Sequence, residues 1–123
     1  MSFAWHEFAD LAEWLTELRS DEASQRTAIN RAYYAAYHAA SAFVRTHEMC
    51  SPDLHLSHQL VWRLIRESGM RHSIEIANLG YDLKDARVWA DYRNPYPGPD
   101  HLASDVDKAI ANSVAIIALL REP

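Results

Sequence analysis

Three residues near the end of the chain have side chains suited to chemistry on a phosphodiester. Arg93 and Asn94 are followed, after a proline-rich stretch, by His101. Cleavage of RNA without a metal needs a base for the 2'-hydroxyl, an acid for the leaving oxygen and a cation for the charged phosphorane. A histidine that titrates near neutrality and an arginine guanidinium suit these roles. The alternative interpretation is a rigid loop with a solvent-facing histidine at the start of a helix.

A second set of polar side chains lies in an alanine-rich stretch without Gly or Pro, which predicts a strong helix. Arg31, Tyr34 and His38 recur there at steps of three and four residues, so they share one side of that helix. This arrangement suits a binding groove or an interface between subunits. A hydrogen-bonded polar stripe between packed helices is the alternative.

Arg87 and Asp91 stand one helical turn apart, and Tyr92 follows them. Exposed charges at this spacing form ion pairs worth only about 0.2–0.5 kcal/mol on a helix. A structural ion pair is therefore a simpler interpretation of Arg87 and Asp91 than a catalytic role.

The sequence offers little for a metal or a phosphate-binding loop. His55 and His58 lie near Asp53, but no third ligand set is evident. There is no Glu-x-x-His pair of the kind that a di-iron bundle uses. The three glycines do not form a phosphate-binding loop. We therefore expect no metal and no cofactor.

Length and composition indicate one soluble domain that spans residues 1–123. The formal net charge of -5 argues against tight, sequence-independent binding of nucleic acid, although a small basic patch is compatible with it. The single cysteine, Cys50, cannot form an internal disulfide and favours a reducing compartment. The chain has no apolar run near the ~20 residues that span a bilayer, and its first residues do not form a signal peptide. We expect a cytoplasmic protein with no membrane partner.

Hydrophobic periodicity and capping residues predict five helices and no strands. The expected spans are Phe3–Leu18, Asp21–His47, a short helix between Ser57 and Gly69, Ser73–Tyr92, and a last helix that Asp100 caps and that reaches Leu120. The expected fold is all-α, an up-and-down four-helix bundle with one additional short helix.

Each long helix has an apolar stripe that should face the core. The first stripe is Phe8, Leu11, Leu15 and Leu18; the second is Ile29, Tyr33, Ala36, Ala40 and Val44; the last is Leu102, Val106, Ala109, Ile110, Ser113, Ile117 and Leu120. The fourth helix has two apolar faces, one with Ile74, Ala77, Tyr81 and Val88, the other with Ile76, Leu79, Leu83 and Ala90. A bundle this small covers only one of them fully, so we expect a homodimer.

Two motifs resemble those of the HEPN-domain family. One is Arg31-Ala32-Tyr33-Tyr34-Ala35-Ala36-Tyr37-His38-Ala39-Ala40, and the other is Leu83-Lys84-Asp85-Ala86-Arg87-Val88-Trp89-Ala90-Asp91-Tyr92. Ser57-His58-Gln59-Leu60 and the closing helix also fit in order and spacing, so the likeness runs from about Glu22 to Leu120.

This resemblance implies a small helical bundle that dimerises. Many members of the family are metal-independent ribonucleases of toxin–antitoxin or defence systems, in which an Arg, a polar residue and a His form the signature. Here the nearest equivalent is Arg93-Asn94 and His101, and the seven residues between Arg93 and His101 exceed the usual gap. Other members lack the pair and bind RNA, nucleotides or partner proteins, some beside a nucleotidyltransferase.

Two functions are therefore compared. The first is a dimerising, non-catalytic module that binds RNA, a nucleotide or a partner such as a nucleotidyltransferase or an antitoxin, through Arg31, Tyr34, His38, Arg87, Asp91 and Tyr92. The second is an endoribonuclease that uses Arg93, Asn94 and His101. The negative net charge and the long gap between Arg93 and His101 favour the non-catalytic module. We also expect Arg31, Tyr34, His38, Arg93 and His101 to surround one cleft at the dimer junction.

Overall fold

Helices make up all the regular secondary structure in residues 3–122, the part of the chain that the structure, a computed structural model, describes. The expected domain spans residues 1–123 and the expected N-terminal segment starts at Met1. Of these, Met1, Ser2 and Pro123 lie outside the described residues. The elements are α1 (His6–Leu18), α2 (Glu22–Thr46), α3 (His58–Glu67), α4 (Ser73–Tyr92), the 3-10 turn η1 (Pro99–His101) and α5 (Leu102–Leu120). The expected all-α class is confirmed.

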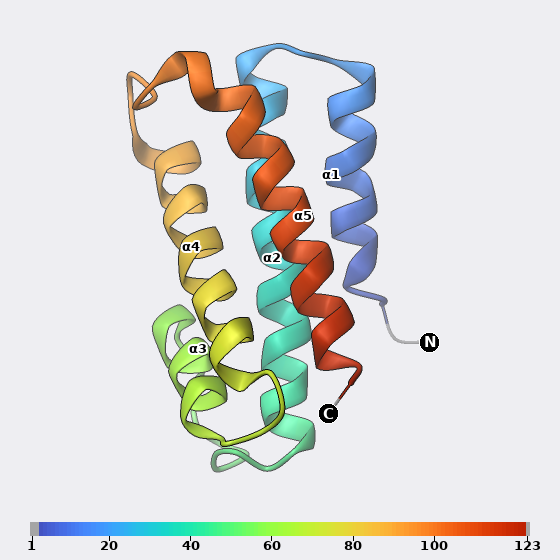
Figure 1. Ribbon diagram of the computed structural model, residues 1–123, viewed down its shortest axis with the longest axis vertical. Helices are drawn as coiled ribbons and strands as arrows, with labels where there is room; N and C mark the ends of the chain where they lie inside the picture. The colour runs from blue at the N-terminus through green and yellow to red at the C-terminus, as the bar shows by residue number, and fades with distance from the viewer. Residues whose placement is uncertain (1–2, 123) are drawn as a thin grey trace.

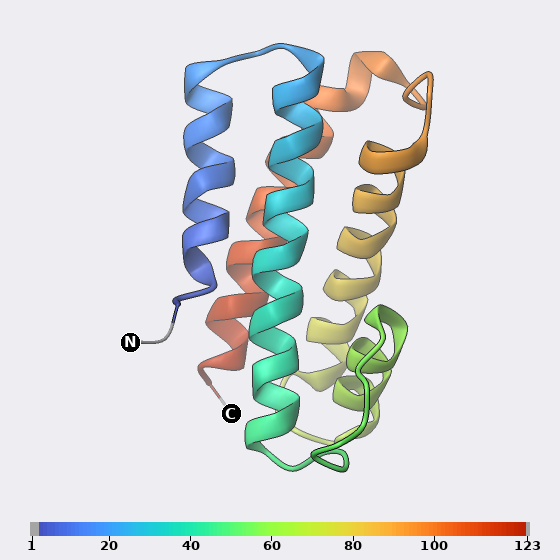
Figure 2. The ribbon, with the colours of Figure 1, turned by 180° about the vertical axis from the view of Figure 1, so that it is seen from behind.

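The four long helices lie side by side and alternate in direction, and the short α3 packs at one end against α2 and α4 (Figure 1). α2 contacts every other α-helix and is the centre of the molecule. Seen from behind, it lies between α1 and α4 (Figure 2). None of the described helices is both long and apolar enough to cross a bilayer.

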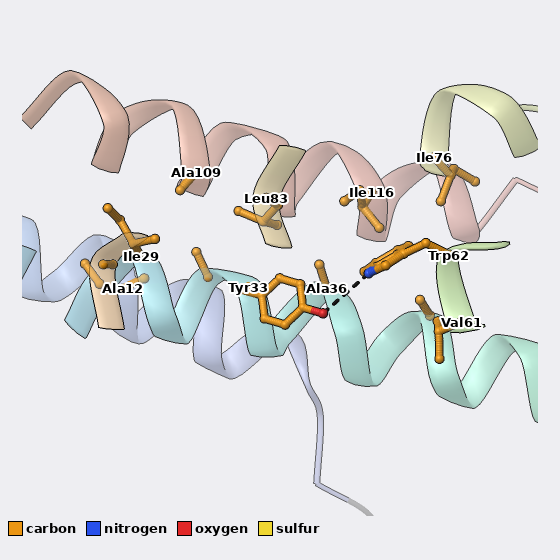
Figure 3. Close-up of a cluster of buried hydrophobic side chains, with 14 of the residues drawn as sticks. Ala12, Ile29, Tyr33, Ala36, Val61, Trp62, Ile76, Leu83, Ala109 and Ile116 are labelled. Carbon is orange, nitrogen blue, oxygen red and sulfur yellow. Dashed lines mark hydrogen bonds between the residues drawn. The ribbon is translucent and has the colours of Figure 1, made fainter. Parts of the chain in front are cut away.

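The expected core stripe of α2 is confirmed, because all five of its residues are fully buried. The helix also begins as expected, since the carboxylate of Asp21 accepts a hydrogen bond from the backbone N–H of Ser24 at 3.1 Å. Tyr33 and Ala36 face the core that α3, α4 and α5 complete (Figure 3).

The expected stripe of α1 is only partly right. Leu11 and Leu18 are exposed, whereas Ala9 and Ala12 are buried. A buried alanine face lets α1 pack closely against α2, and this close approach orients the larger side chains to the edge of the contact or into solvent. The helix also begins at His6 rather than at Phe3.

The middle of the chain follows its sequence signals. Ser57 caps α3 by accepting the backbone N–H of Leu60 at 3.2 Å, and Gly69 follows the end of the helix with a φ of +72°. α4 has the expected bounds. Of its two apolar faces, the one with Ile76 and Leu83 is mostly buried. The other is only partly exposed, because Ala77 is fully buried whereas Ile74 is exposed.

Asp100 does not cap the last helix as expected. It lies inside η1, where the backbone N–H of His101 donates to the carbonyl oxygen of Gly98 at 2.8 Å. α5 then begins at Leu102 without a side-chain cap. Its expected buried stripe is confirmed apart from Ile110, which is half-buried.

Candidate functional site

The polar side of α2 meets α4 and the start of α3 in a group of cationic and aromatic side chains. We call this group the α2–α4 cluster; it consists of Arg31, Tyr34, Tyr37, His38, His58, Lys84 and Arg87. All seven side chains belong to half-buried residues, so the cluster is packed but still reaches the surface.

A chain of polar contacts fixes the two arginines of the cluster. Arg31 donates through Nε to the side-chain oxygen of Asn30 at 2.8 Å, and the side-chain amide of Asn30 donates to Asp91 at 2.9 Å. The same Asp91 oxygen lies 3.1 Å from Nε of Arg87, an ion pair across one helical turn. Nη2 of Arg87 donates to the hydroxyl of Tyr34 at 3.0 Å. The expected Arg87–Asp91 ion pair is thus present, and it links α4 to α2.

The guanidinium groups also lie over aromatic faces. Arg31 lies 5.0 Å from the ring centroid of Phe8 and 5.3 Å from that of Tyr34. Arg87 lies 5.5 Å from the Tyr34 centroid and 5.7 Å from that of Tyr92. Contacts between a cation and an aromatic face stabilise both groups. They hold Tyr34 between two positive charges.

The imidazoles stack within the same group. His38 stacks on Trp5 with 4.1 Å between centroids and on Tyr34 with 5.8 Å. His58 stacks on Tyr37 at 4.3 Å. A continuous row of rings therefore runs beside the two arginines.

A hydrogen-bonded line of buried groups positions His58. Trp62 donates through Nε1 to the Tyr33 oxygen at 3.4 Å, and this oxygen lies 2.7 Å from Nδ1 of His58 (Figure 3 for Tyr33 and Trp62). An indole N–H can only donate, so the hydroxyl proton of Tyr33 is free to be donated to a neutral His58. Burial raises the pKa of Tyr33, which keeps this proton on the phenol.

The environment of both histidines opposes their protonation. Burial lowers the pKa of His38 below its usual 6.5, and the charge of Arg31 lowers it further. Burial also lowers the pKa of His58, as do the charges of Arg87, Lys84 and His38. The cluster is thus a region of positive potential on a chain with a net charge of -5.

The structure brings together all six residues expected to bind a ligand. Contacts join four members of the α2–α4 cluster, Arg31, Tyr34, His38 and Arg87, to Asp91 and Tyr92 at its border, partly through Asn30. The cluster members His58, Tyr37 and Lys84 were not expected there. The motif Ser57-His58-Gln59-Leu60 was the one sequence signal that could have pointed to His58.

Arg93, Asn94 and His101 are placed differently. All three are exposed, and the guanidinium of Arg93 lies 5.9 Å from the ring centroid of Trp89. Trp89 lines a hollow between α4 and α5 rather than the seam with α2. Within residues 3–122, no hydrogen bond, ion pair or ring contact joins Arg93 or His101 to Arg31, Tyr34 or His38. The contacts therefore do not assemble the single cleft expected from the sequence.

Carboxylate, thiol and imidazole side chains are also dispersed. In the described part of the chain, no three His, Cys, Asp or Glu residues gather in the way a metal ion requires. The α2–α4 cluster instead offers guanidinium groups, neutral imidazoles and aromatic faces.

A family model described as the HEPN domain matches residues 7–122, nearly the whole chain. No curated protein and no solved structure matched the chain. The matched range includes every member of the α2–α4 cluster.

Proposed function

The chain belongs to the HEPN family, and we propose that it is a non-catalytic module that binds RNA or a nucleotide at the α2–α4 cluster. The observation that carries the proposal is the position of Tyr34 between the guanidinium groups of Arg31 and Arg87. This arrangement sets two phosphate-binding cations beside one ring of a longer aromatic row.

The chemistry of the cluster suits both parts of a nucleotide. Arginine presents a planar set of donors that matches phosphate geometry. Aromatic side chains stack on bases, and each stacked base contributes roughly 1–3 kcal/mol. Neutral imidazoles, such as those of His38 and His58, each offer a donor and an acceptor to base edges. The cluster thus has groups for a base, a phosphate and a hydrogen-bonded edge.

The whole-molecule charge limits the size of the ligand. Long-range attraction to a polyanion is weak for a chain of net charge -5. Arg31, Arg87 and Lys84 supply three local cations, so about two or three phosphates can be neutralised, with a slope of log affinity against log salt of about -2 on single strands. A nucleotide or a short single-stranded segment is the ligand that fits.

The ribonuclease alternative has no comparable observation in its favour. Arg93 contacts Trp89, and His101 lies across the proline segment at the start of α5. No contact among the described residues joins the two side chains.

We propose that the module acts as a homodimer beside a partner, which in a toxin–antitoxin setting would be a nucleotidyltransferase or an antitoxin.

Binding is tested with a fluorescently labelled single-stranded RNA of about eight nucleotides, and with ATP as competitor. The change is Arg31→Ala, with Arg66→Ala as the matched control, because Arg66 is exposed on α3 away from the cluster. We expect Arg31→Ala to weaken binding by about tenfold, as for a charged hydrogen bond worth about 1.5 kcal/mol, with Arg66→Ala unchanged. Circular dichroism checks that both variants fold. Equal losses in the two variants would refute the site.

Catalysis is tested separately by incubating the same RNA with the wild-type protein and with His101→Ala. We expect the RNA to stay intact in both samples. Cleavage by the wild type that His101→Ala or Arg93→Ala abolishes would establish the ribonuclease and end the non-catalytic proposal.

A further inference from the structure

Two hollows lie along the seam between α1 and α5. Helix α1 lies at the side of the bundle away from α3 (Figures 1 and 2). The hollows, of about 600 and 270 Å³, share Val114 and Ala118 in their linings, so they form one continuous groove. It follows α5 from Asp107 to Arg121. At ~1.5 Å per residue, this stretch is about 22 Å long.

The floor of the groove is apolar. Ile110 and Ile117 lie at its base, and Val114 is 53% exposed within it. Ala111 and Ala118 are exposed beside them. Small residues let the backbone of another helix approach closely, and the exposed valine offers apolar area to bury. Among the helices of residues 3–122, α1 contacts only α2 and α5, so no other described helix covers this side.

The rim of the groove is acidic. Asp10, Glu13 and Glu17 line it from α1, and Asp107 lines it from α5. α1 contains no Lys or Arg between His6 and Leu18. Arg121, at the far end, is the one Lys or Arg among the described residues that line either hollow. A helix that has an apolar stripe flanked by Lys or Arg side chains would complement this apolar floor and acidic rim.

Neither α3 nor the α1–α5 groove of a second copy supplies that stripe. Arg63 and Arg66 are exposed on α3, but Val61 and Ile65 of that helix are buried in its own core. Two α1–α5 grooves placed face to face would bring two acidic rims together, which like-charge repulsion opposes. Charge complementarity therefore favours a helix from another protein as the occupant.

We propose that the α1–α5 groove is the docking site for a basic amphipathic helix of about four turns that belongs to a partner protein. Its apolar side packs on Val114 and the alanines, and its Lys or Arg side chains lie against Glu13, Glu17 and Asp107. The groove shares no residue with the α2–α4 cluster, so this proposal stands independently of nucleotide binding.

The test uses two synthetic peptides of about 15 residues, the length of the groove, with the same leucine pattern. One carries lysines at its other positions and the second carries glutamates. Binding of the labelled peptides is measured by fluorescence anisotropy with the full-length chain. We expect the lysine peptide to bind at least about tenfold more tightly than the glutamate peptide. Equal affinities, or no binding of the lysine peptide, would overturn the proposal.

The site is located by two variants with matched controls. The first is a double variant that carries both Glu13→Lys and Glu17→Lys. Its control carries both Asp53→Lys and Glu67→Lys, an equal change of charge at exposed positions outside the groove. Val114→Gln is compared with Leu54→Gln, since Leu54 is 42% exposed in a loop. We expect about tenfold weaker binding of the lysine peptide in the groove variants alone. Equal loss in the control variants would show general charge attraction and refute the groove.

Discussion

His38 and His58 are the two residues whose protonation should report on the α2–α4 cluster. Both are half-buried against aromatic rings, and both face cationic side chains from their own or a neighbouring helix. Burial and positive charge lower both pKa values from 6.5. The folded chain therefore holds these imidazoles neutral at a pH where the unfolded chain begins to protonate them.

The first prediction concerns stability against pH. Below pH 6.5 the unfolded state binds more protons than the folded state at these two positions, so the free energy of unfolding falls as the pH drops. We expect His38→Gln with His58→Gln to flatten this fall between about pH 6.5 and 5 in urea denaturation. A double variant with an unchanged slope would contradict the assignment.

Ligand binding should raise the pKa values of His38 and His58, which folding lowers. A phosphate beside Arg31 adds negative charge, which favours the imidazolium and raises a histidine pKa. We expect NMR titration to show both pKa values below 6.5 in the free protein and higher values with ATP bound. Values that do not move on saturation with ATP would place the nucleotide elsewhere.

At the scale of elements, the contact between α3 and α4 depends on Gly80. A Cβ atom at this position would lie 2.3 Å from Cε3 of Trp62, closer than real side-chain contacts allow. Trp62 is fully buried and donates to Tyr33, so its ring has little room to move. The same ring supports the Tyr33–His58 hydrogen bond. A shift of α3 would thus disturb the cluster.

We predict that Gly80→Ala destabilises the protein even though alanine favours helices. Overpacking a core costs about 1–3 kcal/mol, which exceeds the ~1 kcal/mol that alanine gains over glycine in a helix. Chemical denaturation measures the loss. The control is the same change in a Trp62→Leu background, where the clash is relieved and the cost should shrink. An equal cost in both backgrounds would show that Trp62 is not the cause.

The buried stripe of α2 was predictable from the sequence, because its apolar residues recur at steps of three and four in an alanine-rich stretch. α1 was harder, because its buried side consists of Ala9 and Ala12, whereas the larger Leu11 and Leu18 face solvent. The expected stripe of α1 was assigned from its large apolar residues alone, and that assignment missed the close contact through Ala9 and Ala12. Likewise, Asp100 has the right residue type for a cap, but the chain turns at Gly98 and forms η1 first.

The sequence could group candidate-site residues by spacing only where they lie on the same helix. Arg31, Tyr34 and His38 follow from spacing on α2 alone. His58 comes from α3 and stacks on Tyr37 of α2, a contact between two helices that no local spacing indicates. Arg93 follows the end of α4, and its guanidinium lies on Trp89 on the α5 side. Its proximity in sequence to Tyr92 therefore does not place it in the cluster.

At the scale of the whole molecule, α4 leaves a second apolar face partly exposed. We call it the outer α4 face, and it comprises Ile74, Tyr81, Val88 and Tyr92, spaced by seven, seven and four residues. Ile74 is 61% and Tyr92 70% exposed, and the other two are half-buried. Tyr92 contacts Arg87, so this face borders the α2–α4 cluster. A two-fold axis there would bring two clusters together and concentrate positive charge.

We therefore predict a homodimer through the outer α4 face. Sedimentation equilibrium at micromolar concentration should give twice the 14.1 kDa of one chain. Ile74→Glu with Tyr92→Glu should give single chains that keep the helical circular dichroism of the wild type, because both positions are exposed and contribute little to the core. Leu18→Glu is the matched control, since Leu18 is 58% exposed on α1, and it should remain dimeric. A wild-type mass of 14.1 kDa, or dissociation caused by Leu18→Glu alone, would contradict a dimer through the outer α4 face. This face would then lie in solvent, and each cluster would bind its ligand with its own three cations.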